Sequence, residues 1–244
     1  MMPQQNPRDD TRFTARRALV LAFVLAGASA LGWAVFSLPL DASGLTGPAL
    51  EQLAKSGVTN PVTAAVLNYR GYDTLIEIGV LLLSVLGVWS VAKADTFANP
   101  PPASPVLWSF VRLVLPVMLL IVGYLLWIGS FAPGGAFQAG AILAGAIVLW
   151  LLADAGRTPL PRAWMLRVTL ALGLVVFIAV AVGVMLPGGK LLEYPPAHAG
   201  SLILVIESAA LVSIAATLAA LFLGGRLAND SDATNSAKPQ KGAR

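Results

Sequence analysis

The chain has 244 residues, of which 57% are hydrophobic and 11% are charged, and it carries a formal net charge of +4. This composition lies well outside that of soluble domains and is typical of an integral membrane protein. Because the chain has no cysteine and a single histidine, His198, the sequence excludes disulfides, thiolate clusters and His-rich zinc sites, and it argues against redox chemistry within the chain.

Six continuously apolar segments are long enough to cross a membrane, which requires about 20 residues for about 30 Å of hydrocarbon. The segments are uninterrupted and do not alternate between polar and apolar residues, so they predict helices and not the strands of a barrel. In chain order they cover residues 18–38, 74–91, 106–128, 136–153, 165–186 and 201–223. The expected fold is therefore an all-α membrane protein with about six transmembrane helices.

The first segment has two interpretations. Arg16 and Arg17, followed by an apolar stretch and the small residues 26–30, are typical of a secretory signal with a cleavage site. The apolar run nevertheless continues through residues 31–38 without a polar break. We favour a retained first helix, whose twin arginines anchor its cytoplasmic end.

Basic residues are unevenly distributed between the connections, and this asymmetry predicts orientation. Those before the first span, in alternate connections and after the last span are Arg8, Arg12, Arg16, Arg17, Lys93, Arg157, Arg162, Arg167, Arg226, Lys238, Lys241 and Arg244. The other connections hold only Lys55, Arg70 and Lys190. We expect both termini to be cytoplasmic, in the inner membrane. Orientation explains the positive charge better than a nucleic-acid partner, so no such partner is expected.

The outer loop before the second span contains a short apolar segment. Asn60 followed by Pro61 is typical of a helix cap with proline in the first turn. The following residues are too few to span, so residues 61–70 predict a short interfacial or re-entrant helix, broken at Gly71. Asp73 would then be the N-cap of the second spanning helix.

A proline-rich stretch, residues 98–105, divides the chain, because it cannot be helical throughout. It predicts a two-helix module at 1–97 and a four-helix module at 106–226. The polar segments 1–11 and 227–244 lack apolar periodicity, and we expect them to be disordered.

Four ionisable residues lie within or at the rim of the spans: Asp73, Glu77, Arg112 and Glu207. A charge at the middle of a bilayer costs about 2.5 to 3.5 kcal/mol even on the lenient insertion scale, so each needs a partner or a role. Helix capping accounts for Asp73, and snorkelling of its long side chain to the interface accounts for Arg112.

Glu77 and Glu207 are not explained in this way. Glu77 lies one turn deeper than Asp73, and either a hydrogen bond to a neighbouring helix, an ion pair with Arg70 or a direct role in an ion path would account for it. Glu207 has no basic residue near it in the sequence. Carboxylates at such depth can load a proton or exchange it for Na⁺, because carboxylate oxygens suit hard cations. We expect no fixed metal site, but transient Na⁺ at Glu77.

A glycine-rich stretch precedes and enters the fourth span. Pro133, Gly134 and Gly135 predict a tight turn at the outer face. Gly140 and Gly145 each lie four residues from an alanine, which is the small-xxx-small spacing of closely packed membrane helices. The sixth span repeats this pattern. No nucleophile with a base, phosphate-binding glycine loop or metal-ligand spacing is found, so we expect no catalytic chemistry and no cofactor.

Three segments resemble known families. RGYDTLIEIGVLLLSVLGVWSV (residues 70–91) resembles the C-terminal module of the large subunit of Mrp-type cation/proton antiporters and the equivalent small subunit of membrane-bound hydrogenases. SFAPGGAFQAGAILAGAIVLWLLA (130–153) is similar to the signature of the antiporter's MnhB subunit, the MnhB domain. VIESAALVSIA (205–215) supplies the acidic start of the last helix.

The turn departs from the family pattern. Phe131 and Ala132 stand where a polar residue is usual, and Ala136 replaces the third glycine of the turn. We therefore expect the turn to serve helix packing and not a polar role.

The resemblance implies a subunit of a multi-subunit cation/proton antiporter, with complex-I-like antiporter subunits, Na⁺, H⁺ and membrane lipid as partners. Glu77 would be the leading ion-handling residue and Glu207 a second acidic site. Asp73, Arg70 and Arg112 would shape the electrostatic field. The alternative is a structural membrane-arm subunit of a respiratory or hydrogenase-type complex. A stand-alone carrier is disfavoured, because six helices show no convincing inverted repeat.

Overall fold

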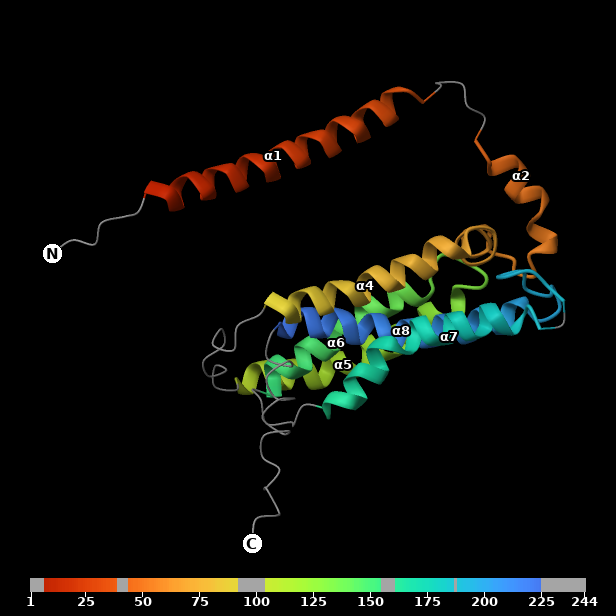
Figure 1. Ribbon diagram of the computed structural model, residues 1–244. Helices are drawn as coiled ribbons and strands as arrows, with labels where there is room; N and C mark the ends of the chain where they lie inside the picture. The colour runs from red at the N-terminus through yellow and green to blue at the C-terminus, as the bar shows by residue number, and fades with distance from the viewer. Residues whose placement is uncertain (1–6, 39–43, 92–103, 155–160, 187, 225–244) are drawn as a thin grey trace, which may run out of the picture. The chain divides into compact units, whose positions relative to one another are not determined.

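The computed structural model describes residues 7–38, 44–91, 104–154, 161–186 and 188–224, without the side chains of 7–16 (Figure 1). The chain forms two compact units, residues 1–47 and 48–244, each considered by itself. All the regular elements in the described residues are helices. Six of them are long and apolar enough to cross a membrane, which confirms the prediction of an all-α membrane protein. The central part of the predicted proline-rich junction and the tail 227–244 lie outside the described residues.

The first unit consists mainly of α1 (Pro7–Phe36), whose apolar part is Arg17–Phe36. The second unit begins with the short α2 (Thr46–Glu51) and η1 (Leu53–Lys55), and continues with α3 (Pro61–Thr63) and η2 (Ala64–Tyr69). Its spanning helices are α4 (Gly71–Val91), α5 (Pro105–Ile128), α6 (Ala136–Asp154), α7 (Ala163–Gly183) and α8 (Ala199–Leu223). The helix boundaries agree with the predicted spans to within a few residues at most ends.

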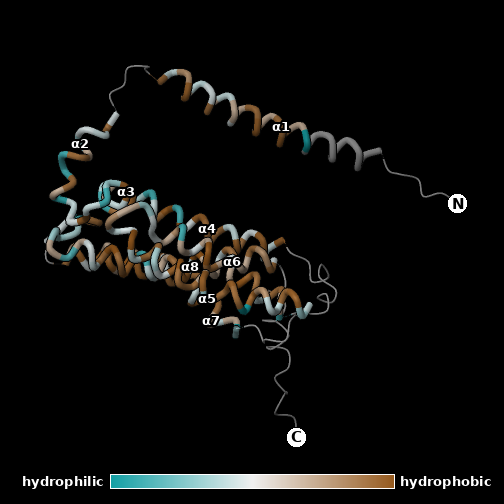
Figure 2. Tube along the Cα trace, turned by 180° about the vertical axis from the view of Figure 1, so that it is seen from behind, coloured by the Kyte–Doolittle hydropathy of each residue, from teal (hydrophilic) through white to brown (hydrophobic). Residues whose placement is uncertain are grey.

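Helix α8 is the centre of the second unit. It packs against α6 and α7 along their lengths and also contacts α4 and α5. Within their apolar windows, 61% of α8 is buried, against 33% at most for any other spanning helix. Figure 2 shows that apolar residues continue around the outside of the bundle, as expected for helices that face lipid.

Small residues allow the close approach to α8. A Cβ atom at Gly173 of α7 would lie 2.9 Å from Ser213 Cβ, and one at Gly140 of α6 would lie 3.0 Å from Ile214 Cγ2. The Ser213 hydroxyl also donates a 2.6 Å hydrogen bond to the Leu170 carbonyl. Gly145 lies on another face of α6, where its Cβ would be 3.5 Å from Met118 Cε of α5. Close backbone packing thus fixes the positions of α6, α7 and α8.

Gly140→Ala is expected to destabilise the isolated chain. The new methyl group would also lie 3.3 Å from the Leu211 carbonyl oxygen, so α6 and α8 would have to separate by a few tenths of an ångström. Overpacking of this kind costs about 1–3 kcal/mol, and we expect a lower thermal unfolding midpoint in detergent. Gly79→Ala in α4 is the matched control, because its methyl group would meet no atom within 4 Å. Equal midpoints for the two variants would contradict the expectation.

The segment before α4 differs from its prediction in two details. Asn60 caps the short helix through a 3.0 Å bond from the Val62 amide, as expected, but the helix widens from α3 into the π-helix η2. The chain turns at Arg70 (φ −124°, ψ 32°) and α4 begins at Gly71. Asp73 is therefore in the first turn of α4 and is not its N-cap, because the helix starts two residues earlier than expected.

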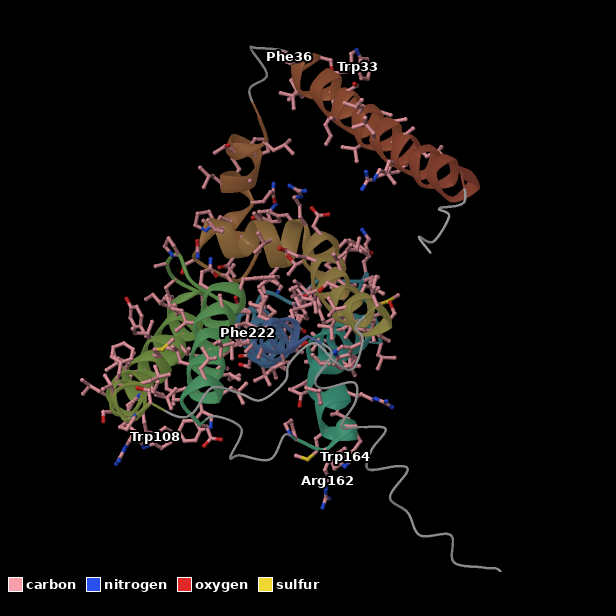
Figure 3. The ribbon with its side chains drawn as sticks, turned by 90° about the vertical axis from the view of Figure 1, so that its left-hand side faces the viewer. Trp33, Phe36, Trp108, Arg162, Trp164 and Phe222 are labelled. Carbon is pink, nitrogen blue, oxygen red and sulfur yellow. The ribbon has the colours of Figure 1, made fainter. Side chains whose placement is uncertain are left out.

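The opposite end of the bundle, where α5 and α7 begin, carries large aromatic and basic side chains. Figure 3 shows Trp108, Arg162 and Trp164 at its periphery. The Trp108 ring packs against the Trp150 ring of α6 with centroids 5.2 Å apart. Tryptophan and arginine are typical of the membrane interface, so this end is suited to lie at headgroup level.

Candidate functional site: an acidic cavity

Glu77 and Glu207 line one cavity of about 250 Å³. It lies between α3 and η2, the start of α4, the start of α6 and the outer part of α8. We call it the acidic cavity; its polar lining side chains are Thr63, Thr74, Glu77, Gln138 and Glu207. Two carboxylates far apart in the sequence are thus brought to the same place.

Glu207 is the buried carboxylate of the acidic cavity. Its side chain is 5% exposed, and its Oε1 accepts a 3.4 Å hydrogen bond from the Ala136 amide. Its Oε2 is buried and has no hydrogen-bond partner among the described residues. The carboxylate therefore faces the amino end of α6, where the helix dipole favours negative charge, and keeps one oxygen free.

Gly135 allows this approach. Its φ is +105°, and a Cβ atom here would lie 2.5 Å from Glu207 Oε1. Its amide donates a 2.9 Å bond to the Leu125 carbonyl, which fixes the turn against the end of α5. The expectation that the turn has no polar role was wrong, because the polar contact comes from the backbone amide of Ala136 and needs no polar side chain.

The turn is also held from the other side by the short helix. The buried Asn60 side chain donates to the Gly129 carbonyl at 3.0 Å and to the Ala132 carbonyl at 2.8 Å. The Thr63 hydroxyl donates to the same Gly129 carbonyl at 2.5 Å. These contacts join the segment before α4 to the α5–α6 connection, so the turn that faces Glu207 is clamped in place.

The π-helix connects the clamp to α4. In η2 the Arg70 amide donates to the Ala65 carbonyl and not to that of Val66. The Val66 carbonyl accepts a 2.6 Å bond from the Thr74 hydroxyl, one turn before Glu77. A continuous set of hydrogen bonds and short helices therefore links the helix of Glu77 to the turn against Glu207, and π-helical turns are frequent at functional sites.

Glu77 differs from Glu207 in its surroundings. Its side chain is exposed on α4 and makes no hydrogen bond or ion pair with another described residue. Arg70 forms an ion pair with Asp73 and not with Glu77. Both partners are largely exposed, so this pair contributes at most about 1 kcal/mol to stability. Glu77 thus lies at the rim of the acidic cavity with its charge uncompensated by the described part of the chain.

The other residues singled out in the sequence are not part of the cavity lining, except Gly134. Arg112 is exposed near the start of α5, at the end of the bundle opposite the acidic cavity. Gly140 and Gly145 contact α8 and α5, and Gly71 packs against Leu192. Sequence reasoning missed Gln138 and the two threonines. Gln138 is a polar residue in the first turn of a spanning helix, and this unusual position was the signal that could have identified it.

Among the described residues, no group of three His, Asp or Glu side chains is placed to hold a metal ion. The acidic cavity offers two carboxylates, one amide and two hydroxyl groups. Oxygen atoms of this kind suit a proton or a weakly held hard cation better than a transition metal.

The comparison with family models decides the family. Residues 106–227, half of the chain, match the model described as a domain related to the MnhB subunit of the Na⁺/H⁺ antiporter. The chain belongs to the MnhB family. The match includes α5 to α8 and therefore Glu207 and the turn, whereas the resemblance of residues 70–91 to a large-subunit module is outside it and stays a prediction.

Relatives of this MnhB-family chain are known in other organisms. An uncharacterized protein of Methanocaldococcus jannaschii is 28% identical over 42% of this chain and 47% of its own length, so the chain spans about half of that relative. A chain of the membrane-bound sulfane sulfur reductase, an archaeal respiratory membrane complex, has a TM-score of 0.65 at 24% identity and covers 87% of this chain and 98% of that one. A chain of the Mrp complex from Dietzia sp. has a TM-score of 0.62 at 22% identity, over 93% of this chain and 26% of that one. At these identities the two structures show a shared fold.

Proposed function

We propose that this MnhB-family chain is a subunit of an Mrp-type cation/proton antiporter complex and that the acidic cavity contributes to its ion path. The observation that carries the proposal is that Glu77 and Glu207, the two unexplained carboxylates of the spans, line the same cavity. The match of residues 106–227 to an antiporter-subunit domain supports the complex, and the fold shared with a chain of the Mrp complex supports it further.

Each carboxylate has a distinct role in this proposal. The free Oε2 of Glu207 is a buried acceptor that a proton or a partly hydrated Na⁺ would satisfy. Glu77, at the rim, would receive the cation or proton from outside the chain, with transient Na⁺ binding there. The Arg70–Asp73 pair would moderate the negative field at the entrance. Arg112 would act only on the opposite end of the path.

The proposed orientation places both termini in the cytoplasm and the chain in the inner membrane. The starts of α4, α6 and α8 are then at the outer side, because three connections that are poor in basic residues precede them. The acidic cavity would consequently open toward the outer half of the membrane, where an exchanged cation enters or leaves.

Glu77→Gln is expected to lower sodium-driven proton flux by about tenfold in vesicles that contain the assembled complex, which corresponds to about 1.4 kcal/mol. The amide keeps the size of the side chain and removes its charge, so assembly is expected to remain normal. Copurified subunits are quantified in parallel with the flux. Wild-type flux for Glu77→Gln would remove its assignment, and loss of flux together with loss of assembly would indicate a structural role.

A second candidate function is a structural subunit of the membrane arm of a respiratory complex. It is favoured by the fold shared with nearly the whole length of a chain of an archaeal respiratory complex. Copurification of the wild-type chain with a redox subunit, without antiport activity, would support this function over the first.

A further inference from the structure

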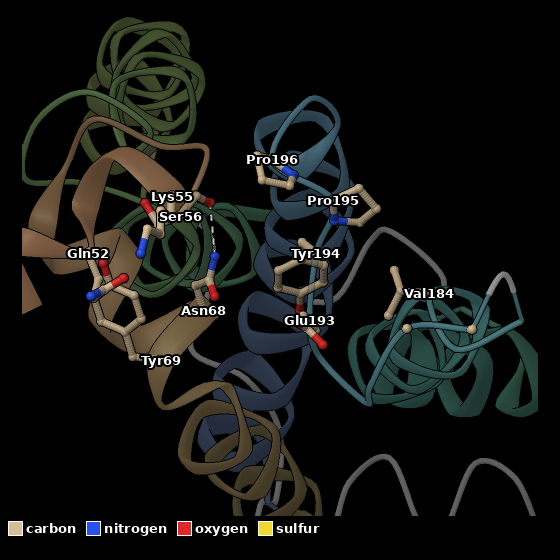
Figure 4. A pocket seen from close by; sticks show the side chains of 12 residues that line it. Gln52, Lys55, Ser56, Asn68, Tyr69, Val184, Glu193, Tyr194, Pro195 and Pro196 are labelled. Atoms are coloured by element: carbon tan, nitrogen blue, oxygen red, sulfur yellow. Dashed lines mark hydrogen bonds between the residues drawn. The ribbon is translucent and has the colours of Figure 1, made fainter.

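A second, larger recess lies outside the acidic cavity. Figure 4 shows it between two segments, residues 52–69 and residues 184–196, beyond the ends of α7 and α8. Its volume is about 910 Å³. We call it the outer groove; its polar and aromatic lining residues are Gln52, Lys55, Asn68, Tyr69, Glu193 and Tyr194.

The walls of the outer groove are held together by close packing. Gly57 has φ +73°, and a Cβ atom there would lie 2.6 Å from the Pro196 carbonyl oxygen and 2.7 Å from Ala199 Cβ. Leu192, with φ 63° and 3% exposure, packs against Gly71 at the start of α4. The shape of the groove is therefore built into the fold and does not depend on an occupant.

Tyr194 is the unusual residue of this groove. Its side chain is 3% exposed, and its hydroxyl is buried with no hydrogen-bond partner among the described residues. Burial raises the pKa of Tyr194 to about 12, so the hydroxyl stays protonated and available as a donor. A buried hydroxyl without a partner is destabilising, and a ligand that hydrogen-bonds to it would recover the lost free energy.

Opposite charges lie on the two walls. Lys55 comes from the first segment and forms no ion pair with a described residue, whereas Glu193 comes from the second and accepts only a 3.3 Å bond from the Lys190 amide (Figure 4). The Asn68 side chain donates to the Ser56 carbonyl and keeps its own carbonyl oxygen free. The groove thus presents donors and acceptors, with a positive and a negative side.

We propose that the outer groove docks an extended extramembrane loop of a neighbouring subunit, whose acidic and basic side chains meet Lys55 and Glu193. A single ion or phosphate group would leave most of 910 Å³ unfilled, and the polar lining does not suit acyl chains. Peptide groups alternate donors and acceptors, which matches the amide and hydroxyl lining. The proposal rests on the membership of a multi-subunit complex proposed above.

The test uses the full chain in its purified complex. A photo-crosslinking amino acid replaces Gln52, and the crosslinked peptides are sequenced by mass spectrometry. We expect them to come from an extramembrane loop of one partner subunit. Lys55→Glu and Glu193→Lys are each expected to lower the crosslink yield by about fivefold. Glu51→Lys is the matched control, because Glu51 is exposed beside the groove but does not line it.

Tyr194→Phe separates docking from folding. It removes only the unpaired hydroxyl, so the thermal midpoint of the isolated chain is expected to stay equal or rise, while the crosslink yield falls by about threefold. Crosslinks to lipid alone, or to a membrane-embedded helix, would overturn the groove proposal while an intact wild-type complex leaves the proposed function in place. A wild-type chain that copurifies with no other subunit would overturn both.

Discussion

Glu207→Gln is expected to lower sodium-driven proton flux by about a hundredfold or more, the largest effect of any single side-chain change in the chain. Glutamine retains an oxygen that can accept from the Ala136 amide, so the turn and the packing of α6 on α8 should persist. It removes the free, titratable oxygen that lies in the acidic cavity without a partner among the described residues. The flux is measured in vesicles that contain the assembled complex.

Two controls define this result. Glu51→Gln removes an exposed carboxylate outside the cavity and should leave the flux unchanged. Glu207→Ala also removes the acceptor for the Ala136 amide, so it should lower the stability by about 1–3 kcal/mol, seen as a lower thermal midpoint, as well as the flux. Wild-type flux in Glu207→Gln would show that the carboxylate serves only to hold the turn.

Gly135→Ala is the second change with a large expected effect. Alanine is strained at φ +105°, at a cost of about 1–3 kcal/mol. Its methyl group would lie 2.5 Å from Glu207 Oε1, so the carboxylate would have to leave the amino end of α6. We expect a lower thermal midpoint and a flux reduced by about tenfold, even though no charged or polar group is altered.

Gly123→Ala is the matched control for this variant. Gly123 lies inside α5, and a methyl group there would meet no atom within 4 Å, so helix propensity predicts unchanged or slightly higher stability. If Gly135→Ala behaved like Gly123→Ala, the close contact between the turn and Glu207 would not exist in the assembled protein.

These two variants distinguish an ion-handling carboxylate from a structural one. The acidic cavity is formed by three parts of the chain: the clamp at Asn60, the start of α4 and the turn before α6. Changes that move the turn should act on Glu207 first, because its only described hydrogen bond is to that turn. Changes that remove the charge of Glu77 should affect transport without affecting stability.

Local features were predictable from the sequence because they depend on neighbouring residues. The apolar runs predicted the six spanning helices, and Asn60 with Pro61 predicted the start of the short helix. The need for backbone freedom at the proline-glycine turn was equally local, as the positive φ of Gly135 illustrates. Asp73 was misplaced by two residues, since the chain turns at Arg70 instead of ending its short helix at Gly71.

Relations between distant segments depend on how the helices pack. The amino-acid sequence alone was enough to predict a membrane protein of six spanning helices with carboxylates at lipid depth, because hydrophobicity and helix length act along the chain. The central place of α8, the pairing of Arg70 with Asp73, and the cavity that Glu77 shares with Glu207 emerged only from the folded chain. Periodicity places a residue on a helix face, but only close contact between small residues of neighbouring helices selects which faces meet.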